Sequence, residues 1–394
     1  MRVLHLFSNW KWTGPAEHAL ITAEHLFEKS YSLTFACGTP PRAVDDSLEK
    51  RVQESGIPLE RCFYLNKHFA LWHNALDVLR LRNYLQKTAV DLIHTHLVND
   101  HLIAAVALRC SSRKIPLIRS IYDGTGQAIT ARDRLLVSHA ADAVITVSEI
   151  AQHTIQKHSG IPAGKIWKIC PGVDCNRFNQ NIDGRAVRLK YGVRDEDPLV
   201  GIVARVQPHR RFDIFIRAIK QVARKIPRIK VFIIGRGTHI QEVAIQPVKD
   251  MGLTDNVVFT GYHLHGYPEL LAALDVKVFL VPGTDGSCRA VREAMAMGKP
   301  VIVSNRGMLP EIVEDGVSGL VVDDTPENLA NAISALLKDA AVRKKMGEAA
   351  RKRIEEDYSS TIQNEKIENV YRQVLEKPIL VGGDEAPQWN NNEM

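Results

Sequence analysis

The 394-residue sequence contains no run of about 18 apolar residues, so no transmembrane helix is expected. Its opening residues, MRVLHLFSNW, pass directly into a strand-like pattern and lack the longer apolar segment of a secretory signal peptide. The six cysteines include no Cys-x-x-Cys pair, which argues against a zinc knuckle and against a dithiol redox motif. Together these absences predict a cytoplasmic protein whose thiols stay reduced.

A moderate excess of basic residues is the clearest feature of the composition. The chain has 51 lysine and arginine residues against 45 aspartate and glutamate residues, a formal net charge of +6. This charge suits anionic partners, but it does not by itself indicate a nucleic-acid binder, and no nucleic-acid partner is expected. The length allows two domains of ordinary size.

Strand-like and helix-like segments alternate along the chain. Apolar runs in the first half predict strands at 3–7, 32–36, 91–94, 116–121, 143–147 and 165–169. Expected strands in the second half lie at 199–204, 230–234, 257–260, 276–281, 300–304 and 320–322. This alternation predicts an α/β fold with two Rossmann-like, doubly wound domains. In such domains ligands bind beyond the carboxyl ends of the strands.

A polar, weakly patterned segment after Pro171-Gly172-Val173-Asp174 divides the chain. We predict a first domain at residues 1–175, a linker at 176–198 and a second domain at 199–358. A final helix is expected at 359–377. The tail, 378–394, is rich in glycine, proline and asparagine and has the composition of a disordered segment.

Residues 278–303, VFLVPGTDGSCRAVREAMAMGKPVIV, are the most informative stretch. The pattern is that of a strand, a glycine-bearing loop, a short helix and a second strand. Asp285 lies in the loop and Glu293 in the helix, so both carboxylates can face one ligand at the positive end of that helix. The alternative is an ordinary strand–loop–helix unit with two solvated acids.

Three other loops carry candidate ligand-binding residues. Arg205 and Arg210 follow an expected strand, and guanidinium groups at such a position suit a diphosphate. Gly235 and Gly237 follow the next strand, and Gly14 enters the first helix; each allows the backbone to approach a ligand closely. The alternatives are a solvated basic turn and plain strand-to-helix connections.

Polar residues also end two strands of the first domain. His94 and His96 share one side of their strand because side chains alternate, but no third ligand is spaced to form a metal site with them, so a metal is not expected. Tyr122 and Asp123 end the next strand. We interpret these residues as the rim of a cleft, while Arg119 or Asp123 could instead be a satisfied structural ion.

Several longer motifs resemble those of a known family. The most specific is EAMAMGKPVIVSN at 293–305, which continues through Leu309-Pro-Glu-Ile to Asp315-Gly-Val-Ser-Gly-Leu. Supporting motifs are the 14–17 loop, DLIHTH at 91–96, VSE at 147–149 and PGVD at 171–174. Over residues from about 1 to 376, the chain resembles the retaining nucleotide-sugar glycosyltransferases of family 4, also described as glycosyl transferases group 1, which have the GT-B fold.

The resemblance implies two domains facing a central cleft, with the final helix crossing back onto the first domain. Arg205 and Arg210 would neutralise the donor diphosphate, Glu293 would bind the ribose hydroxyls and Asp285 would contact the donor sugar. Gly14 would lie under the phosphate from the opposite domain. The remaining implied donor-site residues are Gly235, Gly237, Gly286, Ser287, Cys288 and Arg289, and the acceptor-side residues are His96, Tyr122 and Asp123.

Two positions depart from the family pattern. The family usually has Glu followed by Gly-Phe-Gly, whereas this chain has Asp285-Gly286-Ser287-Cys288. The family also often has a histidine, which contacts the sugar, where this chain has Tyr122. Aspartate keeps the charge with a shorter reach, and the tyrosine changes the acceptor-side chemistry.

The function implied is transfer of a hexosyl or related sugar from a nucleotide-diphosphate sugar to a cell-envelope glycan or lipid-linked acceptor, as in lipopolysaccharide, capsule or exopolysaccharide synthesis. No metal or other cofactor is expected. A second hypothesis is a nucleotide-sugar-binding protein with weakened or lost catalysis that acts as an assembly partner. A third is another GT-B reaction, such as nucleotide-sugar epimerisation.

Contact with an anionic membrane is a further expectation. A helical segment at 76–87 carries Arg80, Arg82 and Lys87, and such a basic helix can hold a domain at an anionic lipid surface. The expected location is therefore the cytoplasm, at the inner face of the cytoplasmic membrane if this helix binds lipid. The alternative is a solvated helix face.

Overall fold

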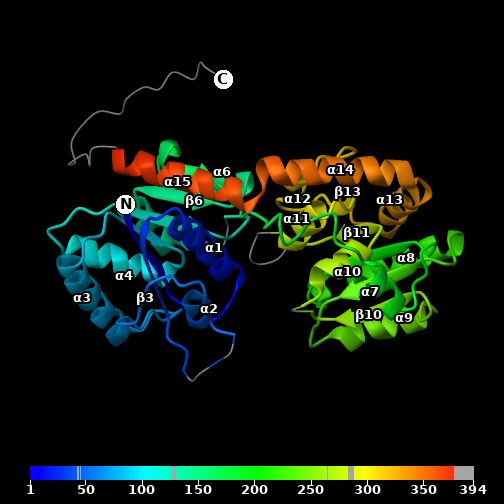
Figure 1. Ribbon diagram of the computed structural model, residues 1–394, viewed down its shortest axis with the longest axis horizontal. Coiled ribbons are helices and arrows are strands. Elements are labelled where there is room, and N and C mark those ends of the chain that lie inside the picture. Colours follow the sequence, from blue (N-terminus) through cyan, green and yellow to red (C-terminus); the bar gives the residue numbers. More distant parts are fainter. Residues whose placement is uncertain (42–43, 45, 127–129, 264, 283–287, 377–394) are drawn as a thin grey trace, which may run out of the picture.

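Two parallel β-sheets form the centres of two α/β domains, which lie side by side in the computed structural model (Figure 1). The structure describes residues 1–41, 44, 46–126, 130–263, 265–282 and 288–376. Residues 378–394, expected to be a disordered tail, lie outside this range.

The elements follow one another in strict alternation over most of the chain. The first domain contains β1 (Arg2–Phe7), α1 (Gly14–Glu28), β2 (Ser32–Cys37), α2 (Leu48–Glu54), β3 (Leu59–Glu60), α3 (Leu71–Lys87), β4 (Leu92–Thr95), α4 (Val98–Arg109), β5 (Leu117–Ile121), α5 (Ala131–Ala140), β6 (Ala143–Thr146), α6 (Glu149–Ser159), η1 (Ala163–Lys165) and β7 (Ile166–Lys168). After it come α7 (Arg185–Lys190), β8 (Leu199–Val203), η2 (Pro208–Arg210), α8 (Phe212–Lys225), β9 (Lys230–Ile234), η3 (Gln241–Ile245), α9 (Gln246–Asp250), β10 (Val257–Gly261), α10 (Tyr267–Ala273), β11 (Val276–Phe279), α11 (Arg289–Ala296), β12 (Val301–Ser304), α12 (Leu309–Ile312), β13 (Gly319–Val322), α13 (Pro326–Lys338), α14 (Ala340–Asp357) and α15 (Ser360–Glu376).

Both sheets reverse their strand order at one point. Over the described residues the first sheet has the order β3-β2-β1-β4-β5-β6-β7, and the second has the order β10-β9-β8-β11-β12-β13. The strand pairs are parallel. The order reverses between β1 and β4 and between β8 and β11, and loops that leave such neighbours in opposite directions open a crevice at the carboxyl ends of the strands. The predicted pair of doubly wound α/β domains is confirmed, and the site is expected at these two points.

The second sheet is buried on both faces because its strands are almost wholly apolar. Val200 and Ile202 of β8 enter a cluster that includes residues of α8 and α13. Leu199 points to the opposite face, where the cluster includes residues of α10 and α11. This two-sided burial is why continuous apolar runs, rather than alternating patterns, mark the strands in the sequence.

The segment between the domains is more than a connector. Residues 176–198 contain α7, and Phe178 and Val193 are buried in the core of the second domain. The chain crosses between domains twice at one place, where Val173 and Ser360 lie side by side: the Val173 amide donates to Tyr358 O (2.8 Å) and the Ser360 amide to Val173 O (2.9 Å). A Cβ on Gly172 would collide with the backbone of Ser360, so glycine is required for this close crossing.

Helix α15 returns to the first domain and packs beside α1 (Figure 1). Ile367, Val370 and Tyr371 are buried in the first-domain core. Glu368 accepts hydrogen bonds from Lys29 Nζ (3.0 Å) and the Tyr31 hydroxyl (2.5 Å) at the end of α1. Burial opposes ionisation of Glu368, but these hydrogen bonds prevail and lower its pKa to about 2. The helix is therefore anchored by both apolar and ionic contacts.

None of the helices in the described part of the chain combines the length and apolar composition needed to cross a bilayer.

Candidate functional site

A cleft of about 1070 Å³, here called the interdomain cleft, opens between the domains at the ends of β8, β9 and β10 and at the start of α11. Most of the second-domain residues singled out in the sequence line it. They are Arg205, Arg210, Gly235, Gly237, Cys288, Arg289 and Glu293. Trp12, Glu17, Arg51 and Arg177 line its other side.

Two arginines place positive charge at the end of β8. Arg205 is exposed, whereas Arg210 is half-buried and donates from Nη1 to the carbonyl oxygen of Val281 at 2.9 Å. Val281 lies in the loop that follows β11, so this hydrogen bond joins the loops that follow β8 and β11 at the switch point. The guanidinium of Arg210 is thereby held in place, which suits it to a fixed anionic ligand.

Gly235 and Gly237 allow the loop after β9 to lie against the loop after β8. A Cβ on Gly235 would collide with Ala204 O, and one on Gly237 with Val206 O. Gly235 also has a φ of +147°, which L side chains rarely adopt. The sequence suggested that these glycines let the backbone approach a ligand closely. In the structure the close approach is between the two loops, and both glycines line the cleft.

A chain of ion pairs joins the domains at the cleft. Arg289, the first residue of α11, donates from Nε to Glu293 at 2.5 Å and from Nη1 to Glu17 of α1. Burial raises the pKa of Glu17, and the neighbouring Arg289 opposes that shift. Cys288, immediately before α11, has a φ of +44°, a left-handed conformation that favours glycine. The resembling family usually has glycine at this position.

Glu293 is shielded from solvent. Its own exposed fraction is 3%, and Lys277 of β11 is fully buried. Burial lowers the pKa of Lys277 to about 7, while the negative charge of Glu293 opposes that shift. In such a setting a hydrogen bond from a ligand to Glu293 is stronger than it would be in water.

Three of the predicted loop residues cannot be placed. Asp285, Gly286 and Ser287 lie outside the described residues, so their roles stay predictions. Gly14 is the first residue of α1, between Trp12 and Glu17, and Asp123 accepts hydrogen bonds from Thr125 in the turn after β5.

Three buried histidines form a cluster in the first domain. The expectation that no third ligand accompanies His94 and His96 was wrong, because parallel pairing sets His5 of β1 directly beside His94. One nitrogen of each of the three rings lies within 4.8 Å of the others. Burial lowers the pKa of His5 to about 3 and also lowers those of the other two histidines.

The ring nitrogens of this cluster lie within hydrogen-bond distance of polar partners. His5 Nδ1 lies 3.0 Å from His96 Nε2, and His94 lies 2.8 Å from the Ser120 hydroxyl and 2.5 Å from the Tyr371 hydroxyl. His96 Nδ1 lies 2.8 Å from the hydroxyl of Tyr122. The cluster thus has the partners that a buried polar network needs, and it links α15 to the predicted acceptor-side residues His96 and Tyr122.

Several cleft residues were not identified from the sequence. Trp12 lies in the loop before α1. Arg51 of α2 stacks over the Trp12 ring at 4.2 Å, and Arg177 comes from the segment after the first domain. Neither arginine belongs to a recognisable motif, so only the fold reveals them.

Family models match both halves of the chain. The model described as "Glycosyl transferases group 1" matches residues 185–353, and the model described as "Glycosyltransferase Family 4" matches residues 12–177.

Curated relatives align with about two thirds of the chain. A GDP-mannose-dependent alpha-(1-6)-phosphatidylinositol monomannoside mannosyltransferase of Mycolicibacterium smegmatis is 31% identical over 263 residues, which are 64% of this chain and 68% of the relative. A D-inositol 3-phosphate glycosyltransferase of Mycobacteroides abscessus is 31% identical over 262 residues, which are 63% of this chain. The match spans only about half, 53%, of that second relative's own length.

Solved structures share the fold over nearly the whole chain. Anabaena Alr3699/HepE in complex with UDP has a TM-score of 0.79 at 22% identity and covers 95% of this chain and 100% of that one. The lipopolysaccharide outer core galactosyltransferase WaaB in its apo form has a TM-score of 0.72 at 15% identity, covering 95% and 99%. At these identities the likeness establishes a common architecture of two facing domains.

Proposed function

Because the chain belongs to the family 4 glycosyltransferases, with the GT-B fold, we propose that it transfers a sugar from a nucleotide-diphosphate sugar to a cell-envelope glycan or lipid-linked acceptor, with retention at the anomeric carbon. The observation that carries this proposal is the meeting of Arg205, Arg210 and Glu293 in one cleft between the domains.

Each of these residues has a role in the proposed reaction. Arg205 and Arg210 bind the diphosphate, whose negative charge grows as its bond to the sugar breaks. Positive groups held at that point stabilise the transition state without reorganising. Glu293 accepts hydrogen bonds from the ribose hydroxyls, and Asp285 contacts the donor sugar.

The departing diphosphate remains on the face that the acceptor hydroxyl attacks, so a nucleophilic carboxylate pair of the glycosidase kind is not required. Guanidinium groups supply the positive charge that a metal would otherwise supply, and we propose that no metal or other cofactor is needed.

The alternative of a nucleotide-sugar-binding protein with weakened catalysis has one observation in its favour. Tyr122, which replaces a histidine usual in the resembling family, hydrogen-bonds His96 and lies in the buried network. The two functions differ in turnover, because both bind the nucleotide sugar but only the enzyme releases free nucleotide diphosphate.

A panel of UDP-, GDP-, ADP- and CMP-linked sugars tests the proposal. We expect one nucleotide class to raise the melting temperature by several degrees, since a ligand at about 100 times its Kd adds about 2.7 kcal/mol to the free energy of unfolding. We also expect slow release of free nucleotide from that donor. Absence of any thermal response would exclude the proposed function, and a response without turnover would favour the binding protein.

We also propose that helix α3 contacts an anionic membrane from the cytoplasmic side. Arg82 and Lys87 are exposed, although Arg80 is engaged with Cys62 O (2.8 Å) and stacks over Tyr64. An exposed apolar group accompanies these charges, which is the combination an interfacial helix uses. It consists of Phe69, Leu71, Trp72, Leu76 and Leu79, with exposed fractions from 42% to 79%.

Co-sedimentation with phosphatidylglycerol vesicles tests the membrane contact. Binding is expected at low salt and should weaken as salt screens the charges. Trp72→Ala should reduce it, whereas Leu135→Ala on α5, where Leu135 is 63% exposed, is the matched control. No binding at low salt, or equal loss in both variants, would rule out α3 as the contact.

A further inference from the structure

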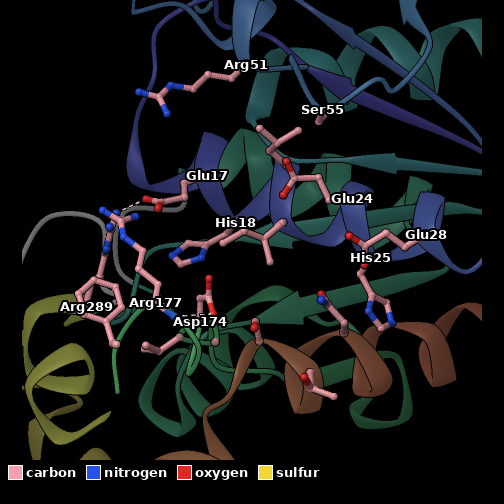
Figure 2. Close-up of a pocket in the computed structure, with 18 of the residues that line it drawn as sticks. Glu17, His18, Glu24, His25, Glu28, Arg51, Ser55, Asp174, Arg177 and Arg289 are labelled. Atoms are coloured by element: carbon pink, nitrogen blue, oxygen red, sulfur yellow. Dashed lines mark hydrogen bonds and ion pairs between the residues drawn. The ribbon is translucent and has the colours of Figure 1, made fainter. Parts of the chain in front are cut away.

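A second cavity, here called the α1 pocket, adjoins the interdomain cleft. It encloses about 580 Å³ between α1 on one side and the crossing segments around Gly172 and Ser360 on the other. The two cavities share Trp12, Glu17, Arg51, Arg177, Arg289 and Glu293 as lining residues. The α1 pocket therefore begins where the Arg289–Glu17 pair joins the domains, beside the place proposed for the donor (Figure 2).

The wall of the α1 pocket contains a buried histidine, His18 of α1. His18 is 3% exposed, and neither of its ring nitrogens has a hydrogen-bond partner among the described residues. Figure 2 shows its ring projecting from α1 into the pocket, above Asp174. A buried polar group left unpaired is unfavourable, so a ligand that forms a hydrogen bond with it is bound more tightly.

The chemistry of His18 suits a hydroxyl group. Burial, assisted by the positive charges of Arg292 and Arg289, holds the pKa of His18 well below its usual value. A neutral imidazole offers one donor and one acceptor, and a sugar hydroxyl can pair with either, because it both donates and accepts hydrogen bonds. The His18 ring also stacks on Tyr122, with centroids 6.1 Å apart and an interplanar angle of 21°, which connects the pocket to the predicted acceptor side.

The charges of the two cavities differ. Among the described residues that line the α1 pocket but not the interdomain cleft are four carboxylates, and there is no lysine or arginine. The four are Glu24, Glu28, Glu54 and Asp174. Burial and the neighbouring Glu28 and Glu17 raise the pKa of Glu24, as expected where negative charges gather. Carboxylates accept hydrogen bonds from hydroxyl or ammonium groups and repel phosphate.

We propose that the α1 pocket binds the acceptor, and that the sugar it takes is polyhydroxylated and carries no negative charge, that is, a neutral or amino sugar. His18 hydrogen-bonds an acceptor hydroxyl, and the carboxylate-lined part of the pocket disfavours sugar phosphates. This inference rests on the proposed transfer function, because it places the acceptor next to the donor across the Glu17–Arg289 pair.

Saturation-transfer NMR on the full chain, with the stabilising nucleotide diphosphate present, tests the inference. The probes are methyl α-glucopyranoside, methyl glucosaminide and glucose 6-phosphate at millimolar concentrations. We expect signals from the first two and much weaker ones from the phosphate. His18→Ala should weaken binding of the first two about tenfold, the effect of losing one hydrogen bond of about 1.4 kcal/mol. The exposed His158→Ala is the matched control.

A second variant keeps the test decisive if His18→Ala does not fold, which its melting temperature reports. The double variant Glu24→Lys, Glu28→Lys changes two surface-facing positions of α1 and should reverse the preference towards glucose 6-phosphate. Equal binding of all three probes by the parent, an unchanged preference in the double variant, or unaltered binding by folded His18→Ala would overturn the inference. No probe binding in a chain that responds to nucleotide would overturn it while leaving the proposed function intact, whereas no response to nucleotide would count against the proposed function itself.

Discussion

Replacing Arg210 with alanine is expected to lower the rate of sugar transfer by about 10²–10³-fold, the usual cost of removing one fixed group that stabilises transition-state charge. Arg210 should matter more than Arg205. It is half-buried and held by its hydrogen bond to Val281 O at 2.9 Å, whereas Arg205 is exposed. A charge that is already positioned loses less entropy when it meets the departing diphosphate. The measurement is product formation at saturating donor.

Two further variants separate charge from geometry. Arg210→Lys keeps the charge but not the paired donors of the guanidinium, so it should recover only part of the lost rate. Arg224→Ala, at an exposed position of α8, is the matched control for loss of a surface arginine. Melting temperatures check that the bond to Val281 is not essential for folding. A rate within about threefold of the parent for folded Arg210→Ala would remove this residue from the proposed mechanism.

Glu293→Gln is expected to weaken nucleotide binding by about 10²-fold, because hydrogen bonds to a charged group contribute about 1.5–3 kcal/mol. The low exposure of Glu293, 3%, strengthens the expected effect. The same substitution also weakens the partner of Arg289, which still pairs with Glu17. Isothermal titration with the nucleotide diphosphate that stabilises the parent measures the change.

A 2′-deoxy nucleotide distinguishes a ribose contact from a general loss of structure. If Glu293 holds the ribose hydroxyls, the parent should bind the deoxy nucleotide less tightly than the ribonucleotide, and Glu293→Gln should bind the two almost equally. Glu242→Gln, at an exposed position, is the matched control. If Glu293→Gln still discriminates as strongly as the parent, the assignment of Glu293 to the ribose is incorrect.

The fold could be predicted largely from the sequence because its signals are local. Parallel strands buried on both faces appear as short apolar runs, and the runs at 230–234 and 257–260 coincide closely with β9 and β10. Short helices were harder to detect. Helix α2 buries only Leu48 and Val52, which is too little to produce a helical pattern, and α7 buries none of its six residues. The 176–198 segment looked like a linker for the same reason, although Phe178 and Val193 enter a core.

The second-domain half of the candidate site could also be predicted from the sequence. Arg205 and Arg210 follow the carboxyl end of β8, where parallel sheets bind ligands, and Glu293 lies in α11 within a continuous motif. The structure adds that these three residues face one cleft with Arg289 and Glu17, which come from different domains. No spacing in the sequence indicates that pair, since its two members are 272 positions apart.

The sequence by itself therefore determined the class of fold through its periodicity. It identified the family and the residues of the second-domain motif through the resemblance of continuous motifs, because both kinds of signal are properties of neighbouring residues. Only the tertiary structure decided which distant groups meet. Pairing of β1 with β4 brought His5 to His94 and His96, and the packing of α1 against the crossing segments left His18 facing a cavity, with no hydrogen-bond partner in the described part of the chain. Such contacts arise from the packing of whole elements, which has no local signature along the chain.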